Sequence, residues 1–503
     1  GPHWFAIYTN IQCERLALAV IHALGYRAYF PERNKWVTHA RIRRVVHRPL
    51  MCRYIFVEIE PTKQGFGPIR LVDGIEAIIG TAGNGVYLAG GGSVTNEASG
   101  KISAYGHGVY IGGPGGTLTN SGTITAGSSG TGVILASGTL KNTGAASYIR
   151  GFDGVAVISG AGDIRNEGTI VGSNDGIDLF NSFNNTVANY GTITGSTAIR
   201  FGGGDDLLKI GTGSVLNGIA DGGAGNDTLE FLANSSGTTS GFINFENFTL
   251  DTGSNWTFTN AVTIASGDTL NNHGTFAGSA WLADSGVVNN YGLIAQTVVL
   301  SDGASLSNAG TITGTSRGVQ GGSGSFTNDG VVRASVRYGV YFSGGGTFIN
   351  GSTANTTAYV YGRLLGVFSK GPVTNYGTIV GSGGGVEVWP GTVDNRGLIQ
   401  GNSGAGVSLA GASTLLNSGI VKSLTGNAVE TSNGASYVYN AGGGAILGSY
   451  SGIAAIGQAT INNAGTISGS MGIWAFHRNY DAVYNERVTN SGTIIGNGGT
   501  AIH

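Results

Sequence analysis

The sequence predicts a mainly β protein, with a small α+β domain at residues 1–80 and a long right-handed parallel β-helix of about 18 turns at residues 81–503. Three observations support this prediction. Glycine accounts for 93 of the 503 residues, and only 11% of residues are charged, against roughly 25% in an average soluble domain. A motif of asparagine and glycine recurs about every 23 residues. The composition also changes abruptly between residues 80 and 81, which sets the domain boundary.

The composition excludes several classes of protein. Collagen needs glycine at every third position and abundant proline, and neither is present. The net charge of −2 and the recurring Val, Ile and Leu argue against disorder, because burial offsets chain entropy. No apolar run approaches the ~18 residues of a membrane helix, and no signal peptide is recognised.

The first 80 residues predict the element order β-α-β-β-α-β around a four-stranded sheet. Aromatic and β-branched runs predict strands at residues 4–9, 26–30, 54–59 and 76–79. The third of these runs is apolar almost throughout, so we expect a central strand. A helix is predicted at residues 11–24, followed by Gly25 as its C′ residue, and a short helix at residues 66–72. Cys13 and Cys52 lack Cys-x-x-Cys spacing, so we expect free thiols in a reducing compartment.

Spaced motifs in this domain carry a family resemblance: Trp4-Phe5-Ala6-Ile7-Tyr8-Thr9, Glu14, Gly25-Tyr26, Tyr29-Phe30-Pro31, Arg48-Pro49-Leu50 and Tyr54-Ile55-Phe56-Val57. Over nearly all of residues 3–80 they resemble the N-terminal domain of NusG-family transcription elongation and antitermination factors. The resemblance implies a cytoplasmic protein that binds RNA polymerase through an apolar patch. The implied contact residues are Trp4, Phe5, Tyr8, Pro31, Pro49, Tyr54 and Phe56. The sequence departs from the family pattern at residues 51–53.

Residues 34–48 form a basic run that carries Lys35, Arg41, Arg43, Arg44 and Arg48. Two interpretations remain open. The run is either a solvated hairpin or a loop that contacts nucleic acid or polymerase, because cationic loops are attracted to phosphate.

Residues 81–503 repeat two landmarks. Asparagine followed two residues later by Gly-Thr-Ile begins at Asn120, Asn166, Asn189, Asn308, Asn375, Asn463 and Asn490. Weaker copies begin at Asn96, Asn142, Asn272, Asn290, Asn328, Asn395, Asn417 and Asn440, and we place Asn217, Asn247 and Asn350 in the remaining gaps. Glycine followed by Val or Ile recurs at Gly85, Gly108, Gly132, Gly154 and Gly176. The period of about 23 residues predicts one coil of three short strands and three turns.

Each residue type has an expected role in the coil. Val and Ile face inward and form the core, while Gly and Asn adopt the left-handed backbone of the turns cheaply. Stacked asparagines are expected to hydrogen-bond along the coil as a ladder. Because each turn is stabilised by its neighbours, the first domain is a candidate cap for one end.

The repeat also resembles a second family. Residues 221–229 (Asp-Gly-Gly-Ala-Gly-Asn-Asp-Thr-Leu), 241–250 and 255–257 are similar to passenger domains of bacterial autotransporters. That resemblance implies display at the cell surface as an adhesin or stalk. The family's signal peptide and C-terminal translocating barrel are not recognised, so we do not expect this chain to export itself.

Residues 202–231 include a stretch that resembles the calcium-binding repeat of β-rolls. Residues 222–227 match that repeat and residues 202–206 align 21 residues upstream, so we expect Asp206 and Asp227 to stack one turn apart. The alternatives are a Ca²⁺ site, since Ca²⁺ takes about six to eight oxygens, and ordinary Asx turns. No other cofactor is expected.

No enzyme motif is recognised, and acidic residues are scattered rather than paired. Asp175 and Asp178 flank an apolar strand, and one of them is expected to face outward. Four tryptophans either pack in the core or form a sugar-binding face: Trp256, Trp281, Trp389 and Trp474.

Two functions therefore remain open for a non-enzymatic chain of two modules. In the first, a NusG-like domain binds RNA polymerase and acts in transcription elongation or antitermination. In the second, the chain is a surface adhesin or structural fibre that contacts a host surface or glycan, and its first domain is a cap or an artefact of fusion.

Overall fold

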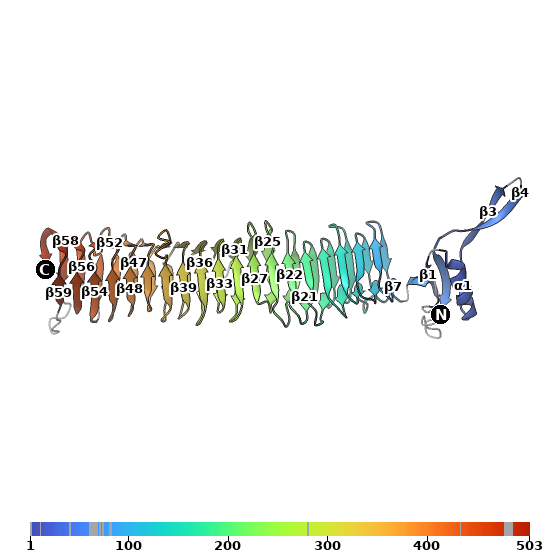
Figure 1. Cartoon of the computed structure of the whole chain (residues 1–503), viewed down its shortest axis with the longest axis horizontal. Coiled ribbons are helices and arrows are strands. Elements are labelled where there is room, and N and C mark those ends of the chain that lie inside the picture. The colour runs from blue at the N-terminus through green and yellow to red at the C-terminus, as the bar shows by residue number, and fades with distance from the viewer. Residues whose placement is uncertain are drawn as a thin grey trace. The chain divides into compact units, whose positions relative to one another are not determined.

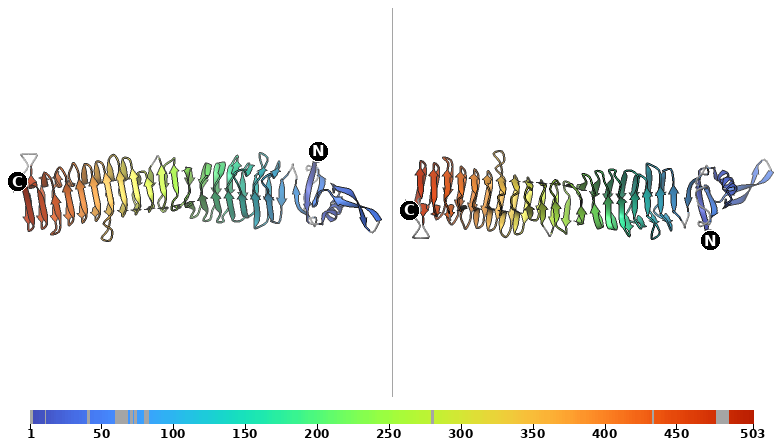
Figure 2. Two further views of the ribbon diagram at one scale, coloured as in Figure 1. Left: turned by 90° about the horizontal axis from the view of Figure 1, so that it is seen from above. Right: turned by 90° about the horizontal axis from the view of Figure 1, so that it is seen from below.

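The computed structural model describes residues 3–10, 12–39, 42–59, 69, 72, 75–79, 83–278, 281–432, 434–476 and 486–503. The chain forms two compact units. The first comprises Gly1–Leu229 with Gly241–Phe245, and the second comprises Glu230–Ser240 with Glu246–His503. Figures 1 and 2 show the elements of each unit. The structure is mainly β, as predicted, with a parallel β-solenoid of about 18 turns from residue 86 onward.

The part of the first unit before the solenoid, called the head below, contains a four-stranded sheet. Its strands are β1 (His3–Thr9), β2 (Arg27–Tyr29), β5 (Tyr54–Ile59) and β6 (Ile75–Ile79), in the order β2-β5-β1-β6. All three pairings are antiparallel. The run that was expected to be central, β5, lies between β2 and β1, which confirms that prediction.

One helix, α1 (Glu14–Ala23), is described in the head, and it begins three residues later than predicted. The delay has a local cause, because Gln12 has a φ of 63° and the Cys13 amide donates to the Asn10 carbonyl, which closes a turn first. Gly25, with a φ of 85°, ends the helix as the expected C′ residue. The second predicted helix lies mostly outside the described residues.

The head core lies between α1 and one face of the sheet. Alternate residues of β1 and β5 point into it, because side chains alternate along a strand. The buried apolar residues are Phe5, Ile7, Ala17, Ile21, Tyr26, Phe30, Ile55, Val57, Ile59, Ile69 and Val72. The other face of the sheet therefore carries the remaining side chains of these strands.

The basic run is a hairpin formed by β3 (Glu32–His39) and β4 (Ile42–Pro49), which pair with each other as a separate two-stranded sheet. The run is therefore a hairpin, and its contact with nucleic acid or polymerase stays a prediction.

In the second unit each regular turn has three strands, for example β36 (Ser305–Asn308), β37 (Thr311–Gly314) and β38 (Arg317–Gly321). Each strand pairs in parallel with the equivalent strand of the next turn. β36 is aligned with β39 (Ser325–Asn328), so that Leu306 meets Phe326 and Asn308 meets Asn328. Inward apolar residues stack on inward apolar residues and form the core.

The first unit builds its turns in the same way. Val109 of β10 (Val109–Ile111) is aligned with Val133 of β13 (Val133–Leu135), and Leu118 of β11 (Gly116–Asn120) with Leu140 of β14 (Gly138–Asn142). All four are fully buried. The expected role of Val, Ile and Leu as the solenoid core is confirmed.

The glycines that precede Val or Ile serve a different purpose from the one expected. None of Gly85, Gly108, Gly132, Gly154 and Gly176 has a positive φ. A Cβ added at any of them would lie 2.4–2.7 Å from the carbonyl oxygen of the equivalent residue in the next turn. These glycines are therefore required for close stacking of backbones. The left-handed backbone expected of turn glycines is found at other positions, such as Gly253 and Gly303.

Candidate functional site

The open face of the head sheet is aromatic. Trp4 and Tyr8 of β1 point to the side opposite α1, as do Tyr54 and Phe56 of β5, because their neighbours in sequence point into the core. Tyr8 is aligned with Tyr54, and their ring centroids are 5.1 Å apart.

The edge strand β2 extends this face. Tyr29 is aligned with Phe56 and is 55% exposed, and Trp4 is 47% exposed. We call Trp4, Tyr8, Tyr29, Tyr54 and Phe56 the aromatic face. Exposed aromatic side chains on a rigid sheet have the chemistry of a protein-binding surface, since they bury large areas with little loss of conformational entropy.

Two of the predicted contact residues do not belong to this surface. Phe5 is 1% exposed and packs in the head core, and Pro31 is also buried. The side chain of Pro49 lies outside the described residues. Tyr29 was absent from the predicted set, although the alternation along β2 and its register with β5 place it on the aromatic face.

The departure from the family pattern at residues 51–53 forms a tight turn. Arg53 has a φ of 71°, and its amide donates to Glu14 Oε1 at 2.8 Å. Its guanidinium donates to the Thr9 carbonyl at 2.9 Å and lies 4.0 Å from the centroid of the Tyr8 ring. The turn therefore supports one end of the aromatic face.

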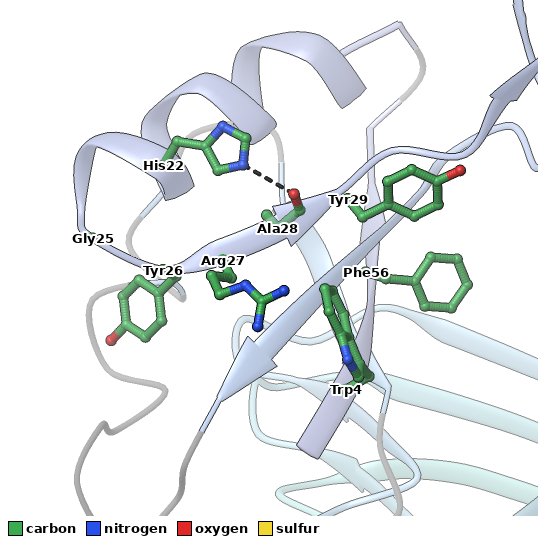
Figure 3. A pocket seen from close by; sticks show the side chains of 8 residues that line it. All are labelled: Trp4, His22, Gly25, Tyr26, Arg27, Ala28, Tyr29 and Phe56. Atoms are coloured by element: carbon green, nitrogen blue, oxygen red, sulfur yellow. Dashed lines mark hydrogen bonds between the residues drawn. The ribbon is translucent and has the colours of Figure 1, made fainter. Parts of the chain in front are cut away.

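A pocket of about 860 Å³ adjoins the aromatic face (Figure 3). Trp4, Tyr29 and Phe56 line it together with His22, Arg27 and neighbouring residues of β2. His22 Nε2 lies 3.0 Å from the Ala28 carbonyl oxygen, so α1 is tied to the edge strand. The aromatic face is thus hollowed at one side rather than flat.

The hairpin separates most of its cations onto one face. The register aligns Arg33 with Arg48 and Val37 with Arg44. Alternation along each strand then groups the basic side chains of one face, which are Arg33, Lys35, Arg44 and Arg48. Like charges directly opposite each other destabilise a strand pair unless an anion screens them.

The other face of the hairpin carries Trp36, which is 62% exposed and has the Arg43 guanidinium 5.6 Å from its ring centroid. Arg43 therefore lies apart from the other predicted cations. Arg41 lies outside the described residues. Cys13 and Cys52 are free thiols.

An asparagine ladder runs along the solenoid, as predicted. Each Nδ2 donates to the Oδ1 of the next member at 2.6–2.9 Å. The first unit contains Asn96, Asn120, Asn142, Asn166 and Asn189. The second unit contains Asn272, Asn290, Asn308, Asn328, Asn350, Asn375, Asn395, Asn417, Asn440, Asn463 and Asn490.

The ladder is interrupted between these two segments, and two predicted members are wrong. Asn217 is exposed and aligned with Thr194, and Asn247 is aligned with Thr269. Apolar residues take the ladder position instead. Ile210 is aligned with Asn189, Leu250 is aligned with Asn272, and β24 (Thr228–Phe231), which lies between them in the chain, ends at Phe231. The prediction for Asn350 is confirmed.

Asp206 and Asp227 stack one turn apart in the first unit. The Asp206 amide donates to Asp227 Oδ1 at 2.7 Å, and the Asn185 amide donates to Asp206 Oδ1 at 2.6 Å. Both carboxyl groups are buried, and burial raises the pKa of Asp206 to about 6. Across the described residues, no three His, Cys, Asp or Glu side chains gather as a metal site. Each of these bonds joins residues 21 apart in neighbouring turns, so it is not the local bond of an Asx turn.

Asp175 and Asp178 differ in exposure, as expected. Asp175 is buried and forms an ion pair with Arg200, while Asp178 faces outward, 3.7 Å from the Arg200 guanidinium. Burial and the nearby Asp153 raise the pKa of Asp178. Arg200 thus neutralises the inner carboxylate.

The four tryptophans do not form one face. Trp256 is fully buried and donates to Ser235 Oγ at 2.8 Å, so it is a core residue. Trp281 and Trp389 are exposed, and Trp474 stacks on Phe476.

No helix within the described parts of the chain is long and apolar enough to cross a membrane.

Comparison with known families agrees with this two-part structure. Residues 2–88 match the family model of the transcription termination factor NusG, and residues 253–397 match that of the BigA fourth domain. No curated protein matches the chain. The head is therefore NusG-like, and the solenoid carries a segment that resembles a domain of a bacterial surface protein.

Proposed function

We propose that this chain is a non-enzymatic interaction protein whose head binds RNA polymerase and acts in transcription elongation or antitermination. The observation that carries the proposal is the aromatic face on a NusG-type domain. Its five side chains lie on the side of the sheet that α1 leaves uncovered, which is where a partner has access. The match to the NusG model over residues 2–88 supports a polymerase as that partner.

The hairpin supports a second contact by the same head. Arg33, Lys35, Arg44 and Arg48 share one face, and the nearby Glu32 is already paired with Arg15 at 2.6 Å. A two-stranded ribbon of this charge fits the phosphate backbone of nucleic acid, because release of counterions favours such binding. We propose that the hairpin contacts nucleic acid held by the polymerase.

The test is direct binding of the full chain to purified RNA polymerase core enzyme. Tyr8→Ala and Phe56→Ala each remove one ring from the aromatic face, and we expect binding to weaken by about tenfold or more. Leu16→Ala is the matched control, since Leu16 is 58% exposed on α1, which packs on the opposite side of the sheet. Unchanged affinity in both face variants, with melting temperatures like the parent protein, would refute the proposal.

The BigA match supports an alternative, in which the solenoid is displayed at the cell surface as an adhesin or structural fibre and the head is a cap or a product of fusion. Labelling intact cells of the native host with an antibody against the solenoid distinguishes the two functions. Labelling of intact cells supports display. Labelling only after lysis, with co-purification of RNA polymerase, supports the transcription role.

A further inference from the structure

A second column of stacked side chains lies in the first unit, apart from the asparagine ladder. Asn185 Oδ1 accepts the Gly162 amide at 2.9 Å. In the next turn Asp206 Oδ1 accepts both the Asn185 amide and Asn185 Nδ2, the latter at 3.0 Å. Asp227 Oδ1 then accepts the Asp206 amide at 2.7 Å. Each member thus receives the amide of the member one turn before it.

Asparagine and aspartate differ in this column at one atom. Asn185 uses its side-chain amide as a second donor to Asp206 Oδ1. The equivalent atom of Asp206 is Oδ2, which is buried and has no hydrogen-bond partner among the residues that the structure describes. An ionised carboxyl cannot donate, whereas a protonated carboxyl has the donor that the column position uses in Asn185.

The charges around Asp206 favour the protonated form. The side chain is 2% exposed, and Asp227 and Asp205 are the charged groups that act on it. Lys209 lies three residues along, at an outward position of β22 (Leu207–Ile210). Burial is the main cause that raises the pKa of Asp206 to about 6, and the two acidic neighbours add to it.

We propose that Asp206 and Asp227 share one proton, held on Asp206 Oδ2 and donated to Asp227, and that this proton closes the two turns between Asn185 and Asp227. When the pH rises, Asp206 releases the proton to water and no new bond forms. Two adjacent buried carboxylates then repel each other, and these turns open more often. The column is a pH-sensitive joint in the solenoid.

The position of the joint restricts the effect to one part of the chain. The asparagine ladder of the first unit ends at Asn189, which donates to Ser214 Oγ rather than to another asparagine. Ile210 occupies the following ladder position. The turns around Asp206 therefore lack the asparagine ladder that joins the preceding turns. These turns can open locally without breaking any bond between ladder asparagines.

Amide hydrogen exchange of the full chain, compared between variants at the same pH, tests the proposal. Asp206→Asn supplies the missing donor permanently. At about pH 7.5 we expect the segment 186–229 to exchange on the order of tenfold more slowly in this variant than in the parent, and at about pH 4.5 equally fast. Protection of the parent should fall as pH rises, because an acid whose pKa is raised in the folded state stabilises the fold at low pH and loses that contribution at higher pH.

Asp205→Asn is the matched control, because it removes one of the acidic neighbours of Asp206 and supplies no donor in the column. An equal gain of protection in both variants would mean that only net charge matters and would overturn the proposal. No difference between Asp206→Asn and the parent at either pH would also overturn it. Slower exchange of the parent on addition of Ca²⁺ at about pH 7.5, reversed by a chelator, would assign the pair to a metal ion instead.

Discussion

The solenoid stabilises equivalent corners of its turns in two different ways. Along the ladder each corner holds a buried asparagine whose amide is bonded to the next asparagine. Between the ladder segments the corner positions are apolar, at Ile210, Phe231 and Leu250. Each ladder asparagine needs a matched partner in the next turn, and where the first segment ends the Asn189 amide donates to Ser214 Oγ instead. Apolar packing has no such requirement, so it permits a change of sequence between successive turns.

The largest expected effect concerns the apolar part of this comparison. Phe258 of the second unit is 1% exposed and contacts Phe231 and Phe276 at centroid distances of 5.4 and 4.3 Å. Phe258→Ala should lower the free energy of unfolding by about 3–5 kcal/mol, because it leaves a cavity in a packed aromatic core. Urea denaturation measures this loss. A loss below about 1 kcal/mol would mean that the aromatic core is not what replaces the ladder.

Asp284, a buried carboxyl group outside the asparagine ladder, tests how a polar side chain in the solenoid contributes to stability. Asp284 is fully buried, accepts the Gly286 amide, and has its pKa raised to about 7 by burial. The unfolded chain releases this proton near pH 4 and the folded chain near pH 7, so stability should fall as pH rises between about 4 and 7, by about 1.4 kcal/mol per pH unit at most. Asp284→Asn should flatten that part of the stability profile. An unchanged slope would contradict the assignment.

Breaking the ladder should cost somewhat less than opening the aromatic core. Asn328 accepts a bond from Asn308 at 2.7 Å and donates one to Asn350 at 2.8 Å. Asn328→Ala leaves a buried donor and a buried acceptor unpaired, which should cost about 2–4 kcal/mol in urea denaturation. Asn217→Ala is the control, since that asparagine is exposed and lies outside the ladder, and it should stay within about 0.5 kcal/mol of the parent.

The smallest expected effect concerns the glycines that allow turns to stack. A Cβ at Gly330 would lie 2.1 Å from the Gly310 carbonyl oxygen, whereas a Cβ at Gly345 would meet no atom within 4 Å. Gly330→Ala should therefore destabilise the chain by about 1–3 kcal/mol through overpacking. Gly345→Ala should be nearly neutral. Equal melting temperatures for the two variants would show that the backbone yields without cost at this contact.

Much of the solenoid could be predicted from the sequence, because period and alternation report directly which residues face inward. Most ladder members have a glycine two residues later in the sequence. Asn174 and Asn402 also have that spacing and are not members, whereas Asn96 and Asn350 lack it and are members. Register between turns decides membership, and register depends on loop lengths that a repeat motif does not encode.

The head shows a similar division. The strands and the central place of β5 follow from apolar runs. Side chains alternate along a strand, so Phe5 must point to the face opposite Trp4 and Ala6. Alternation alone would therefore have excluded Phe5 from the predicted contact residues. The short strand β2 alone could not show on which face of the sheet Tyr29 lies. Its place on the aromatic face depends on the pairing of β2 with β5, which is a long-range contact.

The identical ladder bonds make a whole turn an interchangeable unit of length. Asn308 and Asn328 occupy the same position in successive turns, and each is followed by a residue and then a glycine. The loop at residues 351–358 is long, yet Asn350 Nδ2 still donates to Asn375 Oδ1 at 2.9 Å. Chain length can therefore change by complete turns, or by loops at a corner, without altering the repeat on either side. Insertion or deletion of one complete turn would therefore leave the stacking pattern of the remaining turns unchanged.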